Sequence, residues 1–133
     1  MNYEELIREA NIAKEYSYSP YSHFRVGAAL LTKSGKIYRG CNIENASYGA
    51  TICAERTAVV KAVSEGEKSF EAIAIVSDNE DFTYPCGVCR QFLSEYGLDI
   101  IVVLPGKEQA RVITLGELLP EAFLPADLDG VKK

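Results

Sequence analysis

The sequence predicts an α/β domain with a mixed five-stranded sheet between two helical layers, a three-layer α/β/α sandwich. Segments with strand and helix character alternate along most of the 133 residues. Residues 70–76 form an apolar run with little alternation, as expected for a strand buried on both faces. The last two strand-like segments, 99–104 and 111–114, are separated by only six residues. A parallel pair needs a longer crossover, so these two strands are predicted to be antiparallel.

The N-terminal part is predicted to form a helix followed by a hairpin. Asn2 and Glu5 resemble a capping box, and apolar residues then recur at helical spacing, which predicts a helix over residues 3–15. Two strands are predicted next, at residues 24–32 and 37–43. A short polar connection that contains glycine separates them, which is typical of a hairpin.

Two further helices are predicted, and each begins close to a cysteine. Thr51 is a favoured N-cap residue for a helix that runs to about residue 64. Proline is favoured at the first helical position, so Pro85 is predicted to open a helix that ends near Tyr96. Cysteines near helix N-termini are favoured as thiolates, because the positive end of the helix stabilises the anion.

The C-terminal part is predicted to contain one short helix and a tail. Thr114 with Glu117 has the spacing of a capping box, which predicts a helix over residues 115–119. Two prolines and the polar residues 127–133 then predict an irregular tail.

Composition and charge bound the function. A chain of this length fits a single domain over residues 1–133, and 47% hydrophobic with 25% charged residues is typical of a soluble protein. The net charge of −5 and the lack of a Lys/Arg cluster argue against a nucleic-acid partner and for a small substrate. The sequence has neither a signal-peptide pattern nor an apolar run of membrane-spanning length. We therefore expect a cytoplasmic protein with no membrane partner.

Three of the four cysteines form a metal-binding pattern. Cys53 precedes Glu55 by two residues, and Cys86 and Cys89 follow about 30 residues downstream at C-x-x-C spacing. Three thiolates and one water make a four-coordinate zinc site with an open position, as in catalytic sites. The pattern also fits the signature of zinc nucleobase deaminases, with cysteine in place of the first histidine. The sequence predicts one Zn²⁺ per chain on Cys53, Cys86 and Cys89.

Four sequence blocks, at residues 24–29, 41–49, 53–58 and 85–91, occur in the order typical of one enzyme family. On these blocks the chain, from about Tyr18 to Phe123, resembles the small, homo-oligomeric cytidine deaminases that act on free nucleosides. The resemblance implies a hydrolase that converts cytidine and 2′-deoxycytidine to the uridines with release of ammonia, in pyrimidine salvage. It also implies a nucleoside substrate and a homotetramer whose subunits share their active sites.

The expected chemistry gives roles to Glu55 and Arg56. Glu55 is predicted to be catalytic, taking a proton from the attacking water, passing it to N3 and then protonating the leaving amine. Three thiolates on Zn²⁺ leave a net negative charge, which Arg56 can reduce by donating to a ligand sulfur. Arg90 adjoins Cys89 and is a second candidate for this role. A surface ion pair is the alternative for both arginines.

Substrate-binding residues are predicted near the end of the second strand. Asn42 and Glu44 are two apart on an extended segment, so their side chains point the same way and can reach one ligand. A solvated turn is the alternative. The resemblance assigns both to the ribose 3′-hydroxyl and Phe24 to the pyrimidine ring. Three positions that approach the site of a neighbouring subunit in the family are matched by Ala46, Tyr48 and Phe123. Without the resemblance, the sequence is equally consistent with a Phe123 that packs in the core and anchors the tail.

Several alternatives remain open from the sequence. Cys41 is either a small buried residue or a fourth zinc ligand, which would close the site. His23 is expected on a surface loop. A structural zinc module and a redox dithiol at Cys86 and Cys89 leave Glu55 unexplained. Deaminases of nucleotides, tRNA or blasticidin-type antibiotics are the rivals within the superfamily. The antiparallel final strands and the Asn42/Glu44 pair resemble the free-nucleoside branch.

Overall fold

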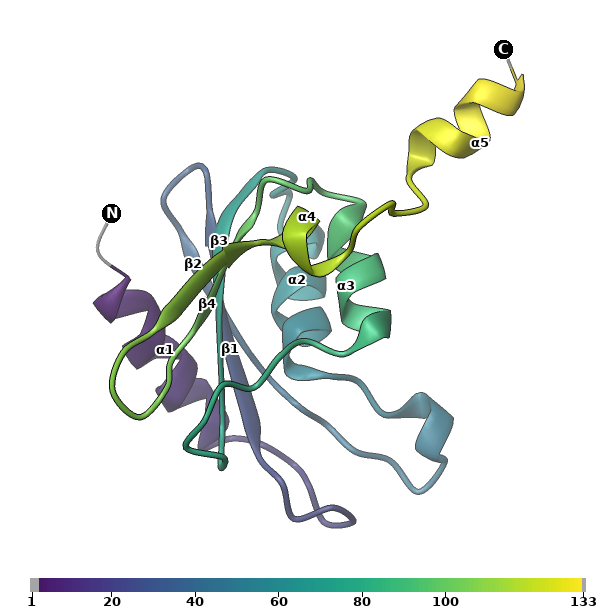
Figure 1. The fold of residues 1–133 in the computed structure, drawn as a ribbon. Helices are drawn as coiled ribbons and strands as arrows, with labels where there is room; N and C mark the ends of the chain where they lie inside the picture. The colour runs from purple at the N-terminus through teal and green to yellow at the C-terminus, as the bar shows by residue number, and fades with distance from the viewer. Residues whose placement is uncertain (1–2, 133) are drawn as a thin grey trace.

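The structure is a computed structural model that describes residues 3–132, in which a five-stranded sheet lies between two layers of helices (Figure 1). The strands follow the order β2-β1-β3-β4-β5 in the sheet. They are β1 (Val26–Thr32), β2 (Ile37–Cys41), β3 (Phe70–Ser77), β4 (Ile101–Leu104) and β5 (Arg111–Thr114). The helical elements are α1 (Glu4–Lys14), η1 (Tyr48–Ala50, a 3₁₀ turn), α2 (Ala54–Ser64), α3 (Gly87–Ser94), α4 (Leu115–Leu118) and α5 (Pro125–Lys132). The predicted α/β/α architecture is confirmed.

The sheet is mixed, as predicted. β1 pairs antiparallel with β2 and with β3, and β3 pairs parallel with β4. The chain between β3 and β4 includes α3, which supplies the crossover that a parallel pair requires. β4 and β5 are antiparallel, with Ile101 opposite Thr114, so the prediction for the final pair is confirmed.

The two faces of the sheet pack into two separate hydrophobic clusters. In β3, Ile73 and Ile75 belong to the cluster on the α2 and α3 side. Ala72 and Ala74 belong to the cluster on the α1 side, together with Leu6. This division follows from the strand itself, because successive side chains point to opposite faces. Both faces of β3 are thus covered, which accounts for its largely apolar sequence.

Two predicted helix starts are wrong, each by two residues. The N-cap of α2 is Cys53 rather than Thr51, whose hydroxyl accepts a hydrogen bond from the backbone N–H of Asn45. The N-cap of α3 is Cys86, so the helix does not begin at Pro85. Each of these cysteines therefore stands at the junction of an extended segment and a helix.

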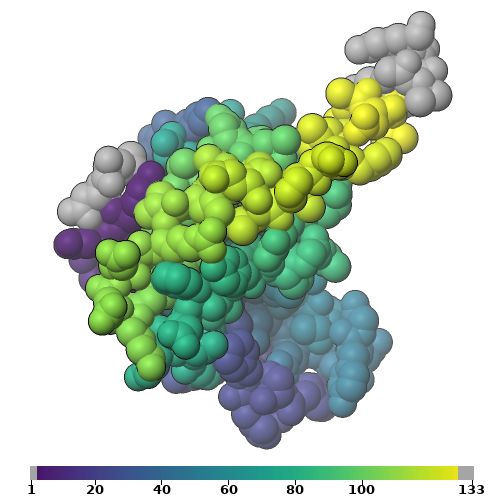
Figure 2. Space-filling model, in the orientation of Figure 1, coloured from purple at the N-terminus to yellow at the C-terminus, as the bar shows by residue number. Residues whose placement is uncertain are grey.

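The chain ends differ from the predictions in two respects. α1 begins after an N-cap at Tyr3 that forms no side-chain cap, and the Asn2 of the predicted capping box lies outside the described residues. Residues 127–132 of the predicted tail are instead part of α5, which projects from the body (Figure 2), and Lys133 lies outside the described residues. The side chain of Asp127 accepts from the N–H of Leu124 and so caps this helix. The capping box of α4 is present as predicted.

Candidate functional site

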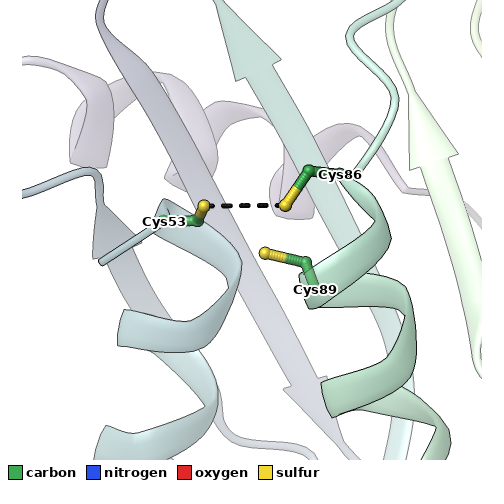
Figure 3. A group of neighbouring side chains, drawn as sticks. All are labelled: Cys53, Cys86 and Cys89. Atoms are coloured by element: carbon green, nitrogen blue, oxygen red, sulfur yellow. Dashed lines mark hydrogen bonds between the residues drawn. The ribbon is translucent and has the colours of Figure 1, made fainter. Parts of the chain in front are cut away.

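The three predicted metal thiols meet where the N-termini of α2 and α3 come together (Figure 3). Cys53 and Cys86 are the N-caps, and Cys89 lies in the first turns of α3. The three sulfurs lie within 4.8 Å of one another, and Cys53 Sγ is 3.8 Å from Cys86 Sγ. Tetrahedral Zn²⁺ with Zn–S bonds of about 2.3 Å requires sulfurs about 3.8 Å apart. The thiol spacing therefore fits zinc, with one coordination position open.

The environment of the thiols favours an anionic sulfur. Hydrogen bonds from Cys89, and then from Arg56 and Cys86, lower the pKa of Cys53 to about 5. The same bond to Cys53, together with burial, raises the pKa of Cys89. The Cys53 sulfur is thus favoured as a thiolate, which is the form of cysteine that binds a soft divalent cation.

Arg56 contacts the thiol group in the way the sequence predicted. Its Nη2 lies 3.7 Å from Cys53 Sγ and 3.4 Å from the carbonyl oxygen of Thr51. The bond to Cys53 is the largest cause of the raised pKa of the guanidinium. The Nε of Arg56 is buried without a hydrogen-bond partner among the described residues. A full positive charge is therefore fixed beside one ligand sulfur.

Glu55 is a buried carboxyl beside the thiols. It lies in the first turn of α2 and is only 4% exposed. Burial is the main cause that raises its pKa to about 7. Glu55 lines a cavity of about 240 Å³ together with Cys53 and Cys86. A carboxyl with this pKa can both accept and donate a proton near neutral pH.

Two predicted substrate residues line the same cavity. Phe24 and Asn42 face it, and Asn42 is buried at the end of β2. The Oδ1 of Asn42 accepts from the N–H of Val26 at 2.9 Å, and its Nδ2 donates to the carbonyl of Phe24 at 2.9 Å. The hydroxyl of Ser17 also donates to this Oδ1. The amide orientation is therefore fixed, with one N–H left for a ligand.

Glu44 lines a neighbouring cavity rather than the same one. This second cavity, of about 390 Å³, is bounded by Glu44 and Tyr48, and it shares Thr51 with the first. The Glu44 carboxylate accepts from the N–H groups of Tyr21 and Ser22 at 3.0 and 3.1 Å. A further hydrogen bond from the Ser22 hydroxyl is the largest cause that lowers the pKa of Glu44. In this structure Glu44 thus organises the loop ahead of β1.

The remaining predicted substrate residues lie away from the thiol cavity. Ala46 is exposed, and Tyr48 is 75% exposed on η1, where its ring meets Tyr21 edge-on. Phe123 is 58% exposed, and its carbonyl accepts from Nε2 of Gln91. The alternative of Phe123 as a core anchor is therefore wrong for this structure.

The structure shows the surroundings of three residues for which the sequence allowed more than one role. Cys41 lies outside the group of three thiols and lines another hollow with Thr57 and Lys61. His23 is exposed on a loop, as expected, with a positive φ of 59°. Among the described residues Arg90 contacts neither a thiol nor a carboxylate, and its guanidinium donates instead to two backbone carbonyls.

Sequence reasoning did not identify several residues that line the thiol cavity, among them Thr83 and Tyr84. Thr83 shares a hydrogen bond with Ser77 at the end of β3, and Arg111 donates to the hydroxyl of Tyr84. The available signal was their position immediately before Pro85, at the start of the second thiol block.

Within residues 3–132, none of the helices combines the length and apolar character needed to cross a membrane.

Comparisons with known proteins agree with this site. Residues 1–104 match the family model described as the cytidine and deoxycytidylate deaminase zinc-binding region. A probable cytidine deaminase of Dictyostelium discoideum is 53% identical, over 96% of this chain and 90% of that protein. The cytidine deaminase of Sporosarcina psychrophila is 49% identical over 96% of each chain.

Solved structures show the same relationship. The cytidine deaminase of Burkholderia pseudomallei superposes with a TM-score of 0.88 at 47% identity, covering 92% of this chain and 100% of that one. The cytidine deaminase of Bacillus anthracis, at 21% identity and a TM-score of 0.73, shares the fold. The resemblance drawn from the four sequence blocks is confirmed, and the zinc-binding family model together with the three-thiol geometry identifies zinc as the cofactor. The chain belongs to the cytidine and deoxycytidylate deaminase family.

Proposed function

We propose that this chain is a hydrolase that deaminates cytidine and 2′-deoxycytidine to uridine and 2′-deoxyuridine, with release of ammonia, in pyrimidine salvage. One observation carries the proposal. A buried carboxyl, Glu55, with a pKa near 7 shares a cavity with a three-thiol zinc site that has an open position. When bound, zinc supplies a Lewis acid that makes a water molecule far more acidic.

Glu55 moves the protons in this reaction. It accepts a proton from the attacking water and delivers it to N3 of the pyrimidine as the water oxygen bonds to C4. It then transfers the second proton of that water to the 4-amino group, and the C4–N bond breaks to release ammonia. A pKa of about 7 suits both steps, because the carboxyl is then available in both protonation states at neutral pH.

Phe24, Asn42 and Glu44 hold the nucleoside in this proposal. Phe24 packs on the pyrimidine, and the free amide N–H of Asn42 donates to the ribose 3′-hydroxyl, which donates in turn to Glu44. The cavity that Phe24 and Asn42 share with Glu55 supports the first two roles, and Glu44 lines the neighbouring cavity that shares Thr51 with it. The net charge of −5 favours a small nucleoside over a polynucleotide.

The assembly in this proposal is a homotetramer in which neighbouring subunits complete each site. Ala46, Tyr48 and Phe123 supply the shared contacts, and their exposure is compatible with this role. We also propose that residues 1–133 act as one domain. The free cysteines suit the reducing conditions of the cytoplasm, where we place the enzyme.

The test is an assay of metal content and turnover on the same samples. Zinc per chain and loss of cytidine absorbance are measured for the wild type and for Glu55→Ala. About one zinc per chain in both, with turnover in the wild type only, is the expected result. A substrate panel of cytidine, 2′-deoxycytidine, deoxycytidylate and blasticidin then defines the specificity. Wild type that holds zinc and turns over none of the four would contradict the proposal.

A further inference from the structure

Arg90 follows the thiol Cys89 directly, yet its side chain reaches two distant points of the backbone. Nε donates to the carbonyl of Pro85 at 2.7 Å, and Nη1 donates to the carbonyl of Leu118 at 2.8 Å. The guanidinium is planar and rigid, so two bonds from one fork fix the relative position of their acceptors. Arg90 therefore connects two segments that are far apart in the sequence.

The first acceptor belongs to the turn that presents a metal thiol. Pro85 is buried and directly precedes Cys86, which is the N-cap of α3. The Cys86 residue itself is exposed. The backbone N–H of Arg90 also donates to the carbonyl of Cys86 at 2.9 Å. The backbone and side chain of one residue thus hold both positions of this turn, which we call the thiol turn (residues 85–86).

The second acceptor lies at the end of α4. The last carbonyls of a helix have no partner within it, and an arginine side chain can satisfy one of them. Beyond Leu118 the chain is irregular as far as Leu124, and Glu121 has a positive φ of 54°. Gln91, the next residue of α3, donates to the carbonyl of Phe123 at 2.8 Å. Arg90 and Gln91 together therefore hold residues 118–123, here called the C-terminal segment.

We propose that Arg90 is a positioning residue that couples the thiol turn to the C-terminal segment, so that its loss loosens the hold on zinc and frees that segment. The effect arises from two directed hydrogen bonds and not from the positive charge. Charge is supplied to the thiols by Arg56, whose Nη2 contacts Cys53 Sγ. The inference concerns metal retention and local structure, so its failure would leave the proposed deaminase activity untouched.

The chain offers a matched control in Gln91. Its side chain bonds the C-terminal segment, as Arg90 does, whereas the carbonyl of Pro85 is bonded by Arg90. Gln91→Ala therefore removes a hold on the segment and leaves the contact to the thiol turn in place. Arg90→Gln removes both contacts of the fork, and Arg90→Lys keeps the charge but not the two-point geometry.

The experiment follows zinc release and local opening in the zinc-loaded, full-length protein. Zinc transfer to excess chromogenic chelator gives the release rate, and hydrogen–deuterium exchange is read on peptides that cover residues 84–89 and 115–124. Arg90→Gln and Arg90→Lys are expected to release zinc about tenfold faster, the effect typical of losing a contact that supports a metal ligand. Both peptides should exchange faster in these variants, whereas Gln91→Ala should speed exchange at 115–124 alone.

Three outcomes would overturn the inference. Release of zinc at the wild-type rate from Arg90→Gln would show that the thiol turn does not depend on the fork. Full recovery in Arg90→Lys would show that the charge, and not the geometry, carries the effect. Release from Gln91→Ala as fast as from Arg90→Gln would show that the C-terminal segment controls zinc by itself.

Discussion

The inner and outer parts of the site are built in different ways. The inner part comprises the three thiols with Glu55 and Asn42, which sit at helix starts and a strand end against the hydrophobic core. The outer part, around Glu44, Tyr48 and Phe123, lies on loops and the 3₁₀ turn η1, where Tyr48 and Phe123 are exposed and Glu44 is half-buried. One chain therefore brings together the groups proposed to carry the chemistry, whereas the groups proposed to bind the substrate are, apart from Asn42, more exposed.

The difference follows from how each part is held. Next to Cys53 and Glu55, Ala54 and Ala58 are fully buried, so the start of α2 is fixed by close packing. The outer segments are held chiefly by hydrogen bonds, such as those from Ser22 to Glu44 and from Gln91 to Phe123. Mutations in the inner part should therefore affect the chemical step, and mutations in the outer part should affect substrate binding.

Glu55→Gln should give the largest effect. Removal of a general acid–base typically costs about 10² to 10⁴ in rate, so kcat should fall by that factor. Zinc content should stay near that of the wild type, because the three cysteines that would ligate zinc are unchanged. Stability should not fall, because the variant no longer buries an ionisable carboxyl. Steady-state kinetics, metal analysis and thermal unfolding check these points, and near-wild-type turnover would remove Glu55 from the mechanism.

The inner part could largely be predicted from the sequence, for a physical reason. Metal chemistry demands particular side chains at short spacing. The amino-acid sequence alone therefore identifies Cys86 with Cys89, and Cys53 with Glu55. The sheet was predictable because buried strands are continuously apolar. The exact helix starts were not, because Thr51 is a favoured cap by residue type, and its hydroxyl is bonded to Asn45 only in the folded chain.

The outer part was less predictable because its contacts come from residues far apart in the sequence. Glu44 bonds the loop at residues 21–22, and Arg90 reaches Leu118, neither of which follows from local spacing. The C-terminal helix does not follow from the sequence pattern, because prolines and polar residues are also typical of a tail. Pro125 instead occupies the first helical position, where proline is favoured.

Arg56→Gln should give the next largest effect and still act on the inner part. Loss of the positive charge beside Cys53 leaves more negative charge on the ligand sulfurs, which weakens the acidity that zinc confers. We expect kcat to fall about tenfold or more while the fold persists. Arg8→Gln, which removes an equal charge at an exposed pair with Glu5, is the control. Equal kinetics for the two variants would exclude a role for Arg56.

Glu44→Gln should affect the outer part and act on KM. The amide replaces one carboxylate oxygen that accepts hydrogen bonds, so a sugar hydroxyl loses an ionised partner. Hydrogen bonds to charged groups contribute about 1.5–3 kcal/mol, so kcat/KM for cytidine should fall roughly tenfold or more. With 3′-deoxycytidine the variant and the wild type should differ little. A fall of the same size with both substrates would show that Glu44 acts only by holding the loop at residues 21–22.

Asp78→Asn should give the smallest effect, on stability and its pH dependence. Hydrogen bonds from the side chain and backbone of Arg25 lower the pKa of Asp78, and Arg25 lies at the end of the loop ahead of β1, which Glu44 of the outer part also holds. The folded state then binds the Asp78 proton less readily than the unfolded state, so this contribution is present above about pH 4 and is lost as the pH falls further. The variant should melt a few degrees lower at pH 7, and this difference should shrink on acidification.

Both partners are partly exposed, so the pH 7 difference should also shrink at high salt. A difference in melting temperature that is constant with pH and salt would mean that Asp78 acts through packing. The loop ahead of β1 would then be held by close packing, as the start of α2 is in the inner part.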